Sequence, residues 1–84
     1  MELHKIKMSK EQYNKLVFGE RLLFINKSEH DIRIGDLVTP LVEDDTYADE
    51  YHDTMALFGT SAVYENAIMH EPWYAIQLTE VEPK

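Results

Sequence analysis

Residues 8–26 have the sequence MSKEQYNKLVFGERLLFIN, and this stretch decides the fold. Ser9 is a favourable N-cap, and Gln12 three residues later completes a capping box. Gly19 suits the position just after a helix, where the backbone adopts a positive φ. Three apolar side chains between these signals share one helical face at the spacing i, i+3, i+4: Tyr13, Leu16 and Val17. We therefore predict a helix over about residues 10–18.

A run of four apolar residues, LLFI at 22–25, follows this helix within the strand-like segment 21–27. Unbroken apolar runs with polar ends are typical of strands that are buried on both faces. The run therefore predicts a strand in the middle of the structure. We accordingly interpret Phe24 as a core residue, with a base-stacking aromatic as the alternative.

Four further segments have the composition of strands, and they lie at residues 4–8, 37–42, 54–65 and 73–81. Pro40 cannot donate a ladder hydrogen bond, so its strand is expected at a sheet edge or bulged there. Gly59 predicts one bulged strand or a tight hairpin in its segment. About five strands and one helix predict an α+β fold with one domain over residues 1–84. In this fold the helix packs against a small curved sheet or partly open β-barrel.

The chain has 84 residues, of which 44% are hydrophobic and none is cysteine. The lack of cysteine excludes disulfides, a thiolate nucleophile and a zinc–thiolate site, and it favours a reducing compartment. The N-terminus shows no apolar signal-peptide region. The longest uncharged run, residues 54–64, is shorter than the roughly 20 residues of a membrane span. We therefore expect a cytoplasmic protein without a membrane partner.

Charge is distributed unevenly along the chain, which carries −8 in total. Residues 1–36 hold seven basic and six acidic side chains, whereas residues 37–84 hold one basic and ten acidic side chains. Nucleic-acid binding draws on basic side chains that neutralise phosphates, so only the first part can present such a surface. Residues 43–53 contain six of the acids and no Lys or Arg, which predicts a solvated loop or a short exposed helix.

Three short motifs stand in unbroken spacing in the first part of the chain: HKIK at 4–7, GERLLFIN at 19–26 and IGD at 34–36. Together they resemble the ASCH domains (activating signal cointegrator homology) of the PUA-like superfamily, in particular the small bacterial and phage members. The resemblance covers roughly the first 40% of the chain. Beyond it, the order of strands and the final WYAIQL segment are compatible with the family. The resemblance implies a PUA-like fold associated with RNA or nucleotides.

Some small members of this family hydrolyse amides with a lysine and a glutamate of the second motif. At these positions the chain has Arg21 and Phe24, and the signature arginine is replaced by Asn26. Phenylalanine cannot transfer a proton, and arginine does not deprotonate near neutral pH. The resemblance therefore implies the scaffold more strongly than the chemistry, and no catalytic residue is predicted.

Five residues are candidates for contacting RNA or a nucleotide: Lys7, Arg21, Asn26, Lys27 and Trp73. Arg21 presents a planar fork that suits phosphate, and the two lysines add charge beside it. Asn26 can hydrogen-bond a base edge. Trp73, with Tyr74 next to it, can stack on a base. We expect these side chains around a cleft between the predicted helix and the strand at 21–27.

Structural interpretations of these residues stay open. Arg21 can instead cap a strand end and pair with Glu20 or a loop acid, which is the more frequent role of a surface arginine. One of Trp73 and Tyr74 can cover the end of the barrel while the other packs inside. His4, although it stands at a family position, is interpreted as structural.

The sequence predicts neither a metal site nor a cofactor. The four histidines stand at 4, 30, 52 and 70, and no two of them have the spacing of a local metal motif. The glycines are isolated, so there is no glycine-rich phosphate loop. The hypotheses are therefore an RNA- or nucleotide-binding module, a protein-interaction module whose acidic residues 43–53 meet a basic partner, and a residual hydrolase of small amides such as an acylated nucleoside.

Overall fold

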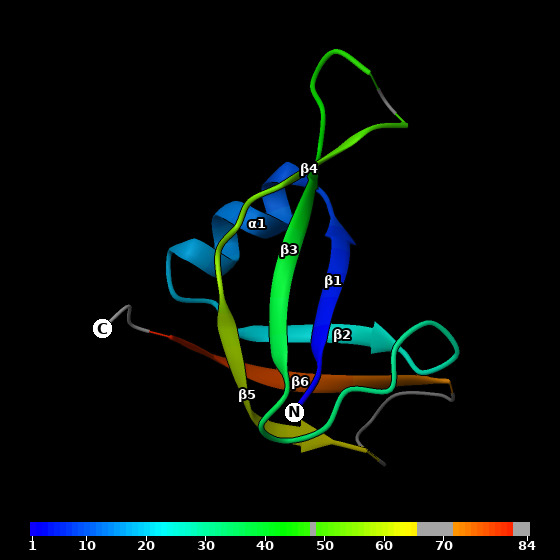
Figure 1. Cartoon of the computed structure of the whole chain (residues 1–84), viewed down its shortest axis with the longest axis vertical. Coiled ribbons are helices and arrows are strands. Elements are labelled where there is room, and N and C mark those ends of the chain that lie inside the picture. The colour runs from blue at the N-terminus through cyan, green and yellow to red at the C-terminus, as the bar shows by residue number, and fades with distance from the viewer. Residues whose placement is uncertain (48, 66–71, 82–84) are drawn as a thin grey trace.

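The computed structural model describes residues 1–47, 49–65 and 72–81. In chain order these residues form β1 (Leu3–Met8), α1 (Lys10–Val17), β2 (Leu22–Asn26), β3 (Leu37–Glu43), β4 (Tyr51–Asp53), β5 (Phe58–Tyr64) and β6 (Trp73–Glu80). The strands make one curled sheet that forms half of a barrel, and the short helix lies beside β3 (Figure 1). The prediction of a small curved sheet with one main helix is thus confirmed.

The strand order in the sheet is β1-β3-β5-β6-β2, and β4 pairs with β3 beside this path. The pair β1–β3 is parallel, and the other pairs are antiparallel. The first two strands of the chain are therefore the two edges of the curled sheet. In Figure 1, β1 and β2 run crosswise to one another, so the barrel stays open between them.

The helix begins and ends where the sequence predicts. The Ser9 hydroxyl accepts the N–H of Gln12 at 3.1 Å, as an N-cap does. At the other end Gly19 has a φ of +112°, and the N–H groups of Gly19 and Glu20 donate to Leu16 and Lys15 in a Schellman pattern. Leu16 anchors the helix, since its side chain is fully buried.

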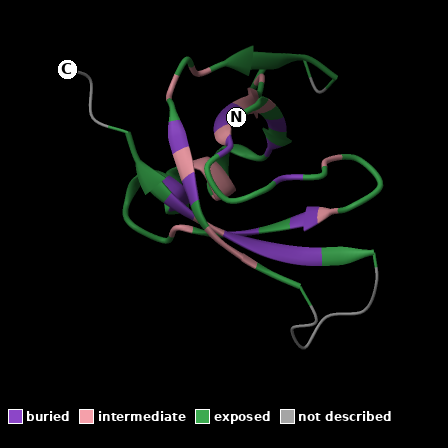
Figure 2. Ribbon diagram, turned by 60° about the horizontal axis from the view of Figure 1, so that its bottom comes forward, coloured by how far each residue is buried: buried purple, intermediate pink, exposed green. Residues whose placement is uncertain are grey.

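The core lies inside the curl of the sheet. It combines side chains from every strand except β4 with one residue of the helix and one of the loop before β3: Ile6, Met8, Leu16, Leu23, Ile25, Ile32, Val38, Phe58, Tyr74, Ile76 and Leu78. Figure 2 shows that the buried residues follow β6 through the middle of the sheet. The predicted strand at 73–81 is present, and its side chains Tyr74, Ile76 and Leu78 are buried together with Ala75. Segment 73–81 thus supplies the central strand of this core.

The prediction for residues 22–25 is wrong in one respect. Leu23 and Ile25 are buried, but Leu22 is 38% exposed and Phe24 is 57% exposed. The reason is that β2 is an edge strand, paired only with β6, and the described residues place no second layer over its outer face. The interpretation of Phe24 as a core residue is therefore wrong as well.

Pro40 lies in the interior of the sheet, so the expectation of an edge strand is wrong. It is buried and stands opposite Ile6 in the parallel pair β1–β3. The N–H of Leu37 donates to Glu2, so Leu37 and every second residue after it direct their backbone groups toward β1. Pro40 is one of the residues between these, and its nitrogen therefore faces away from β1. On that side the antiparallel ladder stops, because β3 changes partner from β5 to β4 there. The missing N–H of proline falls at this interruption.

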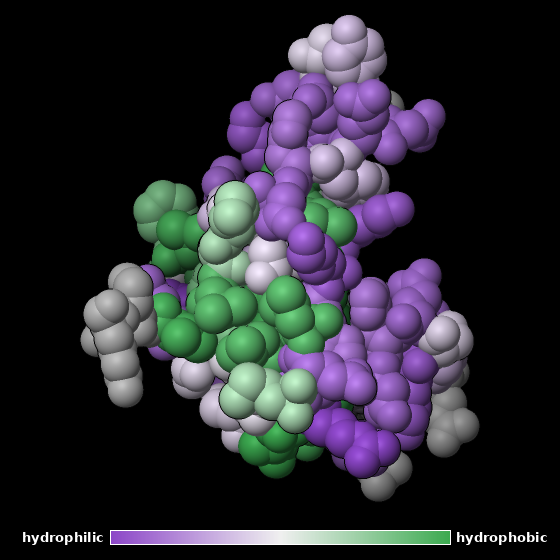
Figure 3. All heavy atoms as spheres, in the orientation of Figure 1, coloured by the Kyte–Doolittle hydropathy of each residue, from purple (hydrophilic) through white to green (hydrophobic). Residues whose placement is uncertain are grey.

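Two other segments also depart in detail from their predictions. Segment 54–65 contains one bulged strand, β5, as predicted, but the irregularity lies between Thr60 and Ala62 and not at Gly59. The prediction of a solvated loop holds for the described residues between β3 and β4, 44–47 and 49–50, most of which are exposed. The flanking residues add what the prediction lacked, since the end of β3 pairs with β4 in a hairpin that projects from the body (Figure 1). Hydrophilic side chains cover this hairpin, whereas hydrophobic ones gather over the middle of the body (Figure 3).

Candidate nucleic-acid interface

A cleft of about 600 Å³ lies where the half-barrel is open, between the edges β1 and β2. We call it the edge groove. Its floor consists of side chains that also belong to the core: Ile6, Met8, Leu23 and Ile25. Residues of the first turn of α1 and of the turn after β2 line its ends. The cleft thus lies between β1 and β2, and the helix that we expected as one wall contributes only its first turn.

Both walls of the edge groove present backbone groups as well as side chains. Because Leu37 donates to Glu2, alternate residues of β1 bond to β3, and the N–H and C=O groups of Lys5 and Lys7 point to the open side. On β2, the backbone groups of Arg21 and of every second residue after it bond to β6. The N–H and C=O groups of Phe24 therefore point outward. The groove thus combines an apolar floor with polar walls.

Two aromatic side chains of the edge groove are strongly exposed. Phe24 is 57% exposed and Trp73 is 49% exposed. Asn26 pairs with Trp73 in the register of β2 and β6, so Phe24, Asn26 and Trp73 lie on one face of the sheet. Diagonal neighbours of this kind have Cα atoms about 7–8 Å apart, which is within reach of large aromatic rings. We call Phe24 and Trp73 the platform, because proteins that bind single-stranded nucleic acid stack bases on exposed aromatic side chains.

Asn26 is held firmly at this platform by a turn. Its side-chain oxygen accepts the backbone N–H of Ser28 at 2.9 Å and the Ser28 hydroxyl at 2.7 Å. Its backbone oxygen accepts the N–H groups of Glu29 and His30. These bonds fix the side-chain oxygen in the turn and leave the amide NH₂ group as a donor.

The basic side chains of the edge groove come from β1. Lys7 places its Nζ atom 5.1 Å from the centre of the Tyr51 ring, in a cation–π contact. Lys5 donates to Asp53 at 2.7 Å. Both ammonium groups therefore reach across β3 to β4, and Lys7 is the one that has no acidic partner among the described residues.

His30, at the end of the edge groove, is a neutral group at pH 7. Its burial, and after it the neighbouring His4, lower its pKa from the ordinary value near 6.5. The two rings meet edge to face with centroids 6.0 Å apart. A neutral imidazole offers one donor and one acceptor, so His30 adds polar contacts to the groove and no fixed charge.

His4 has a structural role, in line with its interpretation from the sequence. Its Nε2 atom lies 3.0 Å from Oδ2 of Asp36. The same oxygen accepts the N–H of Arg33, and Oδ1 of Asp36 accepts the N–H of Glu2. The Arg33 N–H, and after it the His4 ring, lower the pKa of Asp36 to about 2. This carboxylate ties the start of β1 to the start of β3.

The side chains of Glu2, His4 and Asp36 place three potential metal ligands within 4.8 Å of one another. However, the Asp36 oxygens already accept three hydrogen bonds, two of them from backbone N–H groups. A metal ion would compete with these donors for the same lone pairs. The cluster is therefore explained by the link between the two strands.

Arg21 lies outside the edge groove. Its Cζ atom lies 5.3 Å from the centre of the Phe58 ring, and Nη2 lies 3.8 Å from a Glu80 oxygen. Nη1 is buried and has no hydrogen-bond partner among the described residues. Arg21 therefore packs at the other end of β2 and pairs with an acid of β6, where we had considered Glu20 or a loop acid.

Lys27 also points to another part of the surface. Its Nζ atom lies 3.4 Å from Glu65, and its N–H donates to Pro72. Of the five predicted residues, the structure brings Lys7, Asn26 and Trp73 together in the edge groove. It adds Phe24, which the sequence interpretation assigned to the core, and His30, for which the sequence carried no signal.

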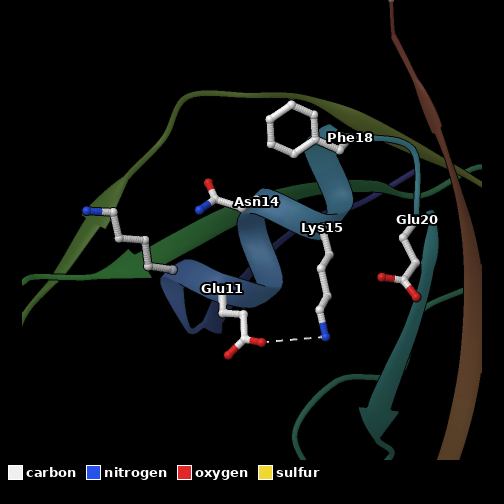
Figure 4. A pocket seen from close by; sticks show the side chains of 6 residues that line it. Glu11, Asn14, Lys15, Phe18 and Glu20 are labelled. Carbon is white, nitrogen blue, oxygen red and sulfur yellow. Dashed lines mark ion pairs between the residues drawn. The ribbon is translucent and has the colours of Figure 1, made fainter.

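A second hollow lies on the outer side of α1 (Figure 4). It is open, and its lining comes from one helix and the residues that follow it. Glu11 and Lys15 form an ion pair across one turn at 3.7 Å, and Phe18 is 88% exposed at the end of the helix. Two of its polar side chains thus pair with each other, and the hollow is a shallow surface beside a single helix, so the edge groove is the better candidate.

Three of the six acids of the hairpin have partners among the described residues. Asp45 accepts Lys10 at 2.8 Å, and Asp53 accepts Lys5 at 2.7 Å. Asp44 accepts two backbone N–H groups of its own turn and contacts His52. Three of its six acids therefore stabilise the hairpin and fasten it to the body.

No protein-family model matches the chain, and the comparison with curated proteins found no relative. The helix that the structure describes is too short and too polar to cross a membrane.

Proposed function

We propose that this chain is a nucleotide-binding module of the PUA-like type that holds single-stranded RNA in the edge groove. The observation that carries the proposal is the exposed aromatic pair Phe24 and Trp73, with Asn26 opposite Trp73 on the same face. The ASCH resemblance of residues 4–36 supports the same function from the sequence. The groove and the resembling segment coincide, since β1, α1 and β2 form most of its lining.

The energetics favour a base as the occupant of this platform. Stacking of a base on an aromatic side chain contributes about 1–3 kcal/mol, whatever the base. Lys7 adds an electrostatic contact to the phosphate backbone, which makes binding dependent on salt. The acidic hairpin keeps Lys5 partly neutralised, so the groove has a weak positive charge and the platform supplies most of the affinity.

Binding without hydrolysis is the activity that these residues support. The signature carboxylate of the family is replaced by Phe24, and the cation Arg21 is turned toward Phe58 and Glu80, outside the groove. A general acid or base must lie within hydrogen-bond reach of the proton that it transfers. A screen with acylated nucleosides tests the remaining hydrolase hypothesis directly.

The proposal is tested by NMR titration of ¹⁵N-labelled protein with short RNA and DNA oligonucleotides at low and at high salt. We expect shifts at Lys7, Phe24, Asn26 and the Trp73 indole, and weaker shifts at high salt. Arg21 and Lys27 serve as internal controls, since they lie outside the edge groove. A flat titration at low salt, or shifts confined to the two control residues, would overturn the proposal.

The protein-interaction hypothesis makes a different prediction for the same samples. Its surface is the projecting hairpin, where Tyr47 is 62% exposed and Asp49 and Glu50 are exposed. Neutralising the two acids leaves the edge groove intact. Loss of capture of a basic partner by this variant, together with a flat RNA titration, would favour the hairpin as the functional surface.

A further inference from the structure

Asn26 offers a ligand only one kind of hydrogen-bonding group. The atom that accepts the Ser28 N–H at 2.9 Å must be the oxygen, because a backbone N–H can only donate. The same oxygen also accepts the Ser28 hydroxyl at 2.7 Å. The NH₂ group, for which no described residue is an acceptor, is what Asn26 presents in the edge groove. The residue thus acts there as a donor.

The second polar group of the platform is a donor as well. The Trp73 indole has one donor and no acceptor, whereas the Lys7 ammonium group lies over the Tyr51 ring of β4. Glu29 and the neutral His30 supply acceptors at the end of the groove. A base that stacks beside Asn26 therefore meets donors along its edge first.

Nucleobases differ in what they present to such donors. Uracil has a carbonyl oxygen at C4, and guanine and hypoxanthine have one at C6, whereas cytosine and adenine have an amino group at the same positions. Asparagine recognises adenine with both amide atoms, and the amide oxygen must then accept from the amino group. In Asn26 this oxygen is already committed to the turn.

We propose that the edge groove prefers bases with a carbonyl oxygen at C4 or C6 over bases with an amino group there, because Asn26 can only donate. This inference rests on the proposed function, since it names the class of base that the same groove takes. The amino bases would place an N–H group against the NH₂ group of Asn26, and one hydrogen bond would be lost. A neutral hydrogen bond of this kind changes affinity by about fivefold.

The test compares matched ligands that differ at this position. Kd is measured by NMR for UMP against CMP and for IMP against AMP, and by fluorescence anisotropy for U and C hexamers at one salt concentration. We expect the oxo member of each pair to bind about fivefold more tightly. Equal affinity within both pairs, with clear binding, overturns the inference and leaves the proposed function standing. No binding of any ligand overturns both.

Asn26→Asp is the decisive variant. Aspartate keeps the oxygen that accepts the Ser28 N–H, so the turn is retained, but it replaces the NH₂ donor by an acceptor. We expect the preference to invert in favour of CMP and AMP. The added negative charge weakens all four ligands alike and cancels in the ratio within each pair. An unchanged ratio in a variant with a native-like spectrum shows that Asn26 does not choose the base, which overturns the inference.

Discussion

Replacing Phe24 by alanine separates the role of this residue in binding from its role in folding. Phe24 is 57% exposed, so just under half of its surface is buried. A fully enclosed phenylalanine buries about 150–250 Å². The buried part of Phe24 thus amounts to about 80 Å², which contributes about 2 kcal/mol to the free energy of unfolding as an upper bound. A domain of this length has about 4–13 kcal/mol of stability, so we expect the variant to fold.

The expected loss of RNA affinity is of similar size but shows in a different assay. Removing a stacking ring weakens binding by about 1–3 kcal/mol, or about 5- to 150-fold in Kd. The assay is fluorescence anisotropy with a labelled U hexamer at low salt, combined with urea unfolding of the same samples. Phe24→Ala should weaken binding by a factor in this range while remaining folded.

Leu22→Ala provides the matched control for this experiment. Leu22 lies on the same strand and the same face, and it is 38% exposed, but it does not line the edge groove. We expect it to lose similar stability and to bind RNA normally. If Phe24→Ala binds within twofold of the original protein, or if both variants lose affinity equally, the stacking platform is refuted.

Three further outcomes follow from the structure. Leu16→Ala, at the fully buried anchor of the helix, should lower the free energy of unfolding by about 2–5 kcal/mol in urea denaturation. Asp36→Asn should be less stable than the original protein above about pH 4, and the difference should shrink as the pH falls from 4 and vanish only below about pH 2. The difference has this direction because the pKa of Asp36 is about 2 in the folded state and about 3.9 in the unfolded state, so this carboxylate stabilises the fold only while it is ionised. The midpoints of urea unfolding at several pH values measure this difference in stability. Lys7→Ala should reduce the salt dependence of RNA binding by about 0.7 in the log–log slope, whereas Lys27→Ala should leave it unchanged.

Local signals in the sequence were sufficient for the helix and for the presence of most strands. Ser9, Leu16 and Gly19 act within one short segment, and the structure uses each of them as expected. Capping and amphipathic spacing involve neighbours in the chain, so the sequence contains all the information that they need. The class of the fold followed from the order of such elements.

The predictions were wrong where the pairing of distant strands decides which side chains are buried. Residues 22–25 look alike in sequence, and only the position of β2 at the edge of the sheet leaves Leu22 and Phe24 exposed. Pro40 is tolerated in the interior because β3 changes its antiparallel partner there, which no local signal indicates. Arg21 was expected at the site from the motif alone, but strand alternation directs it to the side of Leu23 and Ile25, where it meets Phe58.

The same edge position that made Phe24 hard to predict also accounts for the site. A strand with partners on both sides and covered faces would have hidden this ring, and a closed barrel would have joined β1 to β2. Because the sheet stops short of closure, the two edges keep outward backbone groups and an apolar floor between them. Edge strands of this kind are normally protected by charge or by a cover. Lys5 and Lys7 add such charge to β1, whereas the exposed ring of Phe24 leaves β2 without it, and in our proposal the stacked base supplies the cover.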